Sequence, residues 1–160
     1  MCEKQTSQTI SDLNLSRFEM LMYHSKTDAL ITGLPIPENP NIRDLVDYLS
    51  LAGDAIYMHG DPNLDNQKRN ISIEVFLSFD LQDIVSFGKS WLKKWEKNKN
   101  QFWHREWVEI IERADYEEIS EILLASHSES TRKRSSSPLG ELLDFDVMLS
   151  IKRRTNHAKT

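Results

Sequence analysis

Residues 81–125 space their large apolar side chains with the period of an α-helix, and this feature most restricts the fold of the chain. The first stretch places on one helical face Leu81, Ile84, Val85, Trp91, Leu92 and Trp95. A polar break at 97–100, and Asp115 with Glu118 as a capping-box-like start, divide the run into three predicted helices. Short connections make consecutive helices antiparallel neighbours, so we expect an antiparallel helical core at about 81–125.

Two more helices are predicted before this core. One covers about 11–25, and a stiff connector with three prolines follows it at 33–40. Asn41 is expected to cap the next helix, and Gly53 is expected to end it. The segment 60–70 is rich in Gly, Asp, Pro and Asn and predicts a loop.

Two further segments, 71–79 and 144–152, alternate between apolar and polar residues, which is typical of strands with one buried face. A lone strand leaves its backbone groups unpaired, so we expect the two to form a small sheet. The predicted fold class is therefore α+β and mainly helical. The alternative is an all-α fold in which both segments are short buried helices.

The length of 160 residues suits one domain. We expect a flexible tail at 1–10 and a single globular domain formed by 11–125 plus 139–154. Between its two parts, residues 126–138 are rich in Ser and Arg and predict a disordered loop.

Composition indicates a cytoplasmic protein, with nuclear entry if the source is eukaryotic or viral. The single cysteine, Cys2, cannot build a disulfide framework, and no secretory signal or membrane-spanning run is visible. The net charge of −5 is divided into blocks: basic at 89–105, acidic at 106–129 and basic again at 130–160. Such blocks favour charge-complementary contact with a partner.

A search for chemistry predicts no enzyme, no cofactor and no metal site. The glycines are too scattered for a phosphate-binding loop, and the histidines lack ligand spacing. Arg17 and His24 share a face of the first predicted helix, as the catalytic pair of a small helical nuclease would. The competing interpretation is an exposed arginine and a half-buried histidine, and we favour it.

All four tryptophans occur within 91–107 among lysines. We expect these indole rings to build the core, with the lysines on the solvated side. One alternative is a partner-binding surface formed with the acidic helix, with these residues: Trp91, Trp95, Trp103, Trp107, Glu117, Glu118 and Glu121. The other is nucleic-acid binding through these basic residues: Lys93, Lys94, Lys97, Lys99 and Arg105.

Two basic clusters occur at 132–134 and 152–154. They indicate either a solvated linker and chain end or a functional signal, namely nuclear import or phosphorylation at Ser135, Ser136 and Ser137. With no catalytic constellation in view, the expected function is that of a non-catalytic regulatory or adaptor protein that acts through protein–protein contact. The expected partner is another protein, a second copy of the chain, or both; nucleic acid is the alternative.

Overall fold

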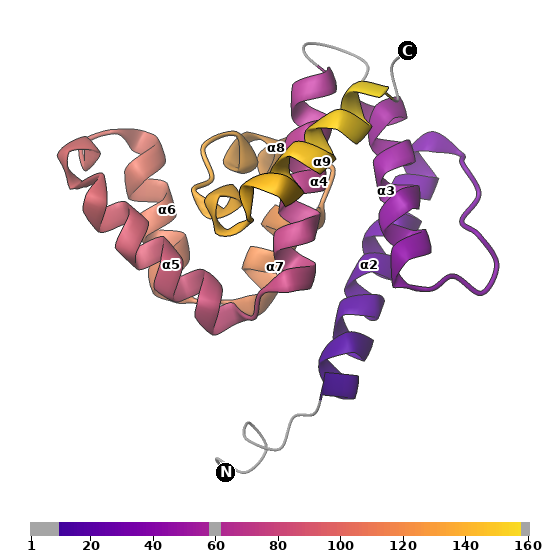
Figure 1. The fold of residues 1–160 in the computed structure, drawn as a ribbon, viewed down its shortest axis with the longest axis horizontal. Coiled ribbons are helices and arrows are strands. Elements are labelled where there is room, and N and C mark those ends of the chain that lie inside the picture. Colours follow the sequence, from indigo (N-terminus) through magenta and orange to yellow (C-terminus); the bar gives the residue numbers. More distant parts are fainter. Residues whose placement is uncertain (1–9, 58–61, 158–160) are drawn as a thin grey trace.

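The structure is a computed structural model that describes residues 10–57 and 62–157, with side chains over 16–57 and 64–153. In these ranges the chain forms eight α-helices and two short 3₁₀ helices, and no strand (Figure 1). The elements are α2 (Ile10–Thr32), α3 (Ile42–Ile56), α4 (Pro62–Ser78), α5 (Leu81–Lys94), η1 (Glu96–Asn98), α6 (Phe102–Arg113), α7 (Tyr116–Leu124), α8 (Ser128–Ser135), η2 (Leu139–Leu142) and α9 (Phe145–His157). The tail predicted at 1–10 lies outside the described residues, apart from Ile10.

The mainly helical prediction is confirmed, but the predicted sheet is wrong and the all-α alternative fits the described residues. Segment 71–79 belongs largely to α4, whose buried stripe includes Asn66, Arg69 and Ser72 besides its apolar residues. When these buried polar residues are counted with the apolar ones, the buried positions follow the period of a helix. The apolar residues alone follow the alternation of a strand.

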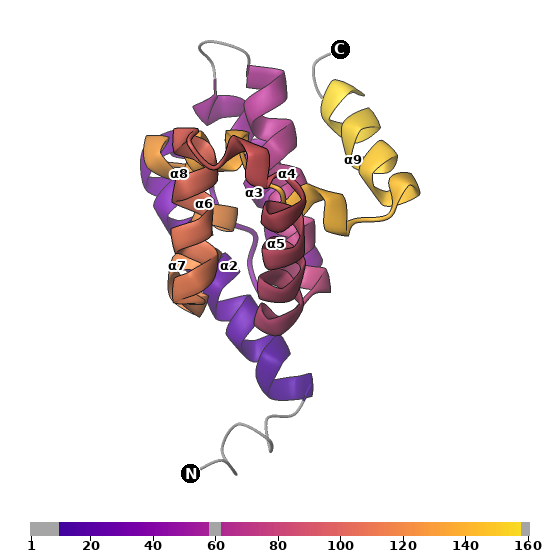
Figure 2. The ribbon, with the colours of Figure 1, turned by 90° about the vertical axis from the view of Figure 1, so that its left-hand side faces the viewer.

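α4 is the central element of the fold. It packs against α3, α7, α8 and α9, and the views show it between the α2–α3 pair and the α5–α6 hairpin (Figures 1 and 2). Ile73 and Val75 have no exposed surface, although they point to different sides of the helix. A helix buried on several sides has little contrast between its faces, so no amphipathic stripe marks it in the sequence.

Segment 144–152 belongs to α9, which lies on α4. Ile151 is 1% exposed, whereas Phe145 is 77% exposed and Val147 is 37% exposed. The apolar residues of the apparent alternation therefore do not share a buried face, and the strand predicted at 144–152 is wrong.

Boundaries elsewhere follow local physical causes. Asn41 caps α3 as predicted, accepting a hydrogen bond from the backbone N–H of Asp44 at 2.8 Å. Gly53 does not end that helix, because it lies inside α3 where Asn66 of α4 approaches its backbone. A Cβ at Gly53 would lie 2.0 Å from the Asn66 side-chain oxygen, so the glycine permits close contact between α3 and α4.

The three helices predicted over 81–125 correspond to α5, α6 and α7. Asp80 and Asp83 form a capping box at the start of α5, and Asp115 caps α7 by accepting from the N–H groups of Glu117 and Glu118. The first predicted helix, at 11–25, continues to Thr32 in α2.

The segment 126–138, for which composition predicts disorder, contains α8. Its anchor is Arg134, which is 3% exposed and donates hydrogen bonds to the carbonyls of Ile122 and Ala125 and to the Tyr57 hydroxyl. Burial lowers the pKa of Arg134 to about 10, so the guanidinium is still charged at pH 7 and can donate all of these hydrogen bonds. One buried arginine thus orders a segment that has few apolar residues.

A buried ion pair ties distant parts of the chain together. Asp28 of α2 and Arg69 of α4 lie 2.7 Å apart with side chains 1% and 0% exposed. Arg69 also donates two hydrogen bonds to the Leu124 carbonyl, and the Ser126 hydroxyl donates to Asp28 at 2.8 Å. These bonds offset the cost of removing both charges from water.

Candidate functional site

The end of α5, η1 and the start of α6 form a tip at the edge of the molecule, remote from α2 and α3 (Figure 1). Three half-buried indole rings pack together there: Trp91 lies 5.8 Å from Trp95 and 5.9 Å from Trp103, centroid to centroid. The Lys97 amine lies 5.3 Å from the Trp95 ring centroid. We name the following residues the aromatic–basic tip: Trp91, Lys94, Trp95, Lys97, Lys99 and Trp103.

The fourth tryptophan has a different role. Trp107 is fully buried, and its indole N–H donates to the Lys133 carbonyl at 3.3 Å. The core interpretation therefore describes Trp107, while the other three rings lie partly at the surface. Helical spacing does not separate the two cases, because Trp103 and Trp107 share a helical face.

The basic residues named by the nucleic-acid alternative are all exposed, and none forms an ion pair within the described residues. They do not form one surface. Lys93 lines a shallow pocket of about 420 Å³ between α5 and α6, together with Lys89, Glu96 and Glu112. That pocket is balanced in charge, so the unbalanced positive charge on this hairpin lies around the indole rings.

Two of the three glutamates named in the partner-binding prediction have partners within the protein itself. Glu118 pairs with Arg113 at 2.7 Å, and Glu121 lies 3.1 Å from His127. Glu117 is exposed and forms no ion pair within the described residues. The three carboxylates therefore do not act as one acidic surface.

The basic cluster at 132–134 is mostly occupied by intramolecular contacts. Arg132 pairs with Glu106 at 2.7 Å and with Glu129 at 3.1 Å, and Arg134 is buried. The buried arginine could reach an import receptor or a kinase only if α8 unfolded. Lys152 and Arg153 of the second cluster are exposed.

Arg17 and His24 do not meet in one site. Arg17 lines a surface pocket, whereas His24 is 5% exposed inside the fold. Burial, and to a lesser extent the neighbouring Arg69, lowers the pKa of His24 to about 4, against a weaker opposing effect of Asp28 and Glu121. Among residues with described side chains, no three His, Cys, Asp or Glu residues gather closely enough to hold a metal ion. No described helix is long and apolar enough to cross a bilayer.

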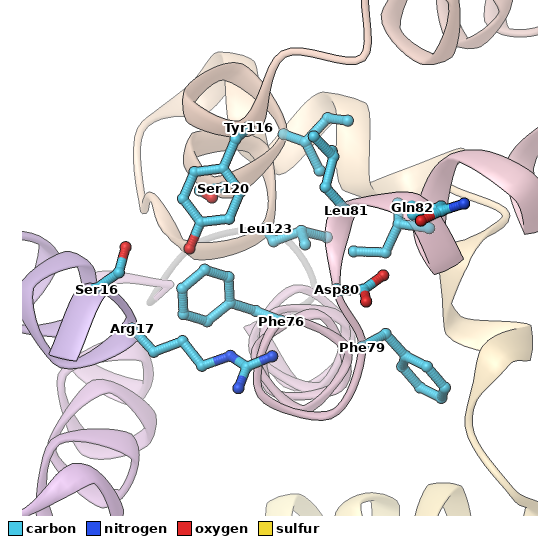
Figure 3. A pocket seen from close by; sticks show the side chains of 12 residues that line it. Ser16, Arg17, Phe76, Phe79, Asp80, Leu81, Gln82, Tyr116, Ser120 and Leu123 are labelled. Atoms are coloured by element: carbon cyan, nitrogen blue, oxygen red, sulfur yellow. The ribbon is translucent and has the colours of Figure 1, made fainter. Parts of the chain in front are cut away.

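The surface pocket of Arg17 has a volume of about 660 Å³ and opens where α2, α4, α5 and α7 meet (Figure 3). We name it the four-helix pocket. Its lining consists of Ser16, Arg17, Phe76, Phe79, Asp80, Leu81, Gln82, Ile84, Tyr116, Ile119, Ser120 and Leu123. Sequence reasoning missed this pocket, because three segments distant in the sequence build it and most of its residues have the pattern of core residues.

Comparison with known proteins does not assign the chain to a family. No family model, curated protein or solved structure matches it. The features of the chain that bear on its function are the aromatic–basic tip and the four-helix pocket.

Proposed function

We propose that this protein is a non-catalytic regulatory or adaptor protein that uses the aromatic–basic tip to contact an acidic surface of a partner protein. The observation that carries the proposal is the combination at the tip of half-buried indole rings with lysines that have no ion-pair partner within the described residues. Tryptophan is the residue type most enriched among those that dominate binding energy at protein interfaces.

The geometry of the tip supports a rigid contact surface. The His104 ring nitrogen lies 2.9 Å from the Leu92 carbonyl, which joins the end of α5 to the start of α6. Mutual packing of Trp91, Trp95 and Trp103 limits their rotamers before a partner arrives. A preorganised aromatic surface loses little entropy on binding, and the lysines around it favour an acidic partner.

The second candidate is a single-stranded nucleic acid on the same tip. Lys97 over the Trp95 ring is the observation that favours it, because indole rings stack on bases while ammonium groups follow phosphates. The two candidates differ in salt dependence and in sensitivity to nucleases.

The test uses a tip variant with Lys94→Glu, Lys97→Glu and Lys99→Glu. A matched control carries the same charge change at three exposed positions away from the tip: Lys26→Glu, Lys152→Glu and Arg153→Glu. Immobilised wild type and both variants are incubated with nuclease-treated host lysate, and the retained proteins are compared. We expect a protein retained by wild type and by the control but lost with the tip variant.

Retention that does not differ between the tip variant and the control would refute the proposal. The nucleic-acid candidate is tested by titrating wild type with an oligothymidylate of about 20 nucleotides at several salt concentrations. Binding that falls steeply with salt and disappears in the tip variant would replace the protein partner by nucleic acid. Sedimentation velocity of the wild type tests the expected homodimer.

A further inference from the structure

We propose that the four-helix pocket binds an amphipathic carboxylate with one apolar chain, of the size of a medium-chain fatty acid. Its carboxylate would lie on Arg17 and its chain on the apolar floor. The pocket volume of about 660 Å³ falls in the usual range for small-molecule sites, roughly 300–1,000 Å³. This ligand is independent of the partner proposed for the aromatic–basic tip.

The floor of the pocket is apolar and belongs to the rigid part of the fold. Phe76, Ile119 and Leu123 line it and are 4%, 2% and 1% exposed. The ring of Tyr116 packs 6.5 Å from that of Phe76, which gives one wall a fixed aromatic surface. Such a surface gains stability when a hydrocarbon chain displaces water from it.

Arg17 and three hydroxyl-bearing residues lie on one side of the pocket, and Asp80 and Gln82 lie on the other. Figure 3 shows Ser16, Arg17, Tyr116 and Ser120 in one half of the view, across from Leu81 and Gln82. Within the part of the chain that the structure describes, Arg17 forms no hydrogen bond or ion pair, and its guanidinium has a planar fork that matches a carboxylate. This side of the pocket therefore offers a cation without an ion-pair partner among the described residues, and Figure 3 shows its guanidinium next to the Phe76 ring.

Ser120 and Tyr116 both belong to α7 and lie one helical turn apart, and both line the pocket. Each side chain carries a hydroxyl that can donate a hydrogen bond to a ligand oxygen.

The one acidic residue of the lining does not compete for Arg17. The Asp80 carboxylate accepts a hydrogen bond from the backbone N–H of Asp83 at 2.8 Å and caps α5. It lies on the same side of the view as Leu81 and Gln82 (Figure 3). An anionic head group would therefore lie at Arg17, away from the Asp80 carboxylate, which is the second charged group of the lining.

The test is calorimetric titration of the whole chain with dodecanoate below its critical micelle concentration. Dodecyltrimethylammonium, with the same chain and the opposite charge, is the second probe. We expect one dodecanoate per chain, and affinity about 10- to 100-fold lower in an Arg17→Gln variant, the usual loss for a charged hydrogen bond. The matched control is Arg105→Gln, which changes an exposed arginine of α6 that has no ion pair within the described ranges, and this variant should bind as wild type.

Three results would overturn the proposal: no binding of dodecanoate by wild type, equal affinity in the Arg17→Gln and Arg105→Gln variants, or equal binding of the cationic probe. A Ser120→Leu variant, which fills the pocket, should lose dodecanoate binding. If that variant fails to fold by circular dichroism, the Arg17→Gln comparison still decides, because Arg17 is not a core residue. Dodecanoate binding does not involve the aromatic–basic tip, so the result of this titration does not depend on whether the tip binds a partner protein.

Discussion

His24 shows how one buried ionisable side chain makes stability depend on pH. Its pKa falls from the ordinary 6.5 to about 4 because the folded protein withdraws the ring from water and places it near Arg69. The unfolded chain therefore binds a proton at a higher pH than the folded chain.

The first prediction follows from that difference. As pH falls from 6.5 towards 4, the unfolded state is increasingly protonated and the folded state is not, so stability is lost across this window. The loss from this residue is about 3 kcal/mol at most. Urea unfolding at a series of pH values should show it in the wild type and in a His127→Gln control, but not in His24→Gln. The same slope in His24→Gln would contradict the assignment.

The buried pair of Asp28 and Arg69 carries the second prediction. Asp28→Asn keeps the shape of the side chain but leaves Arg69 charged, fully buried and without its counter-ion. We expect a loss of about 3–5 kcal/mol in the free energy of unfolding.

The matched control is Glu118→Gln, which breaks the solvent-exposed pair with Arg113 at the same distance of 2.7 Å. An exposed pair contributes below about 1 kcal/mol, so chemical denaturation should separate the two variants clearly. Similar losses in both would mean that the Asp28–Arg69 pair adds no special stability.

At the scale of elements, Gly88 sets how closely α5 and α6 approach. A Cβ added there would lie 2.6 Å from Cδ1 of Ile111, closer than nonbonded carbon atoms allow. The helix hairpin thus depends on a residue that helix propensity alone disfavours.

The third prediction is that Gly88→Ala destabilises the protein by about 1–3 kcal/mol despite the better helix propensity of alanine. Ile111→Val removes the methyl group nearest to the new Cβ and should itself cost about 0.5–1.5 kcal/mol. In the double variant the cost of Gly88→Ala should shrink. Additive costs in this double-mutant cycle would show that the two residues do not constrain each other.

The elements also show what sequence could and could not predict. Caps at Asn41, Asp80 and Asp115 were predictable, because capping depends on neighbours within three positions. α4 was not, because half of its buried stripe is polar and is satisfied by residues as remote as Leu124.

The two candidate sites also differ in whether neighbouring or distant residues of the sequence build them. The tip lies within one short segment, so its residues could be named from sequence, although their exposure could not. The four-helix pocket combines Arg17, Phe76 and Ser120 from distant segments and needed the three-dimensional fold.

At the scale of the whole molecule, contacts between distant segments predict one cooperative unit. Trp107 bonds to the carbonyl of Lys133, and the α2–α4 ion pair continues to Leu124 and Ser126. These links couple the tryptophan-bearing hairpin to the rest of the fold.

The fourth prediction is therefore a single unfolding transition. Tryptophan fluorescence reports only residues 91–107, whereas far-ultraviolet circular dichroism reports all the helices. The two signals should coincide in a urea titration. A fluorescence transition at lower urea would show that the hairpin unfolds alone, and the predicted single domain would then be wrong.

The bond between Asp28 and Ser126 joins residues 98 positions apart and has a consequence for synthesis. Until Leu124 and Ser126 are translated, Arg69 lacks the Leu124 carbonyl and Asp28 lacks its serine donor. An ion pair without these hydrogen bonds does not offset the cost of removing its charges from water, so Asp28 and Arg69 have to stay hydrated until then. Burial of this pair is thereby delayed until Ser126 has been synthesised.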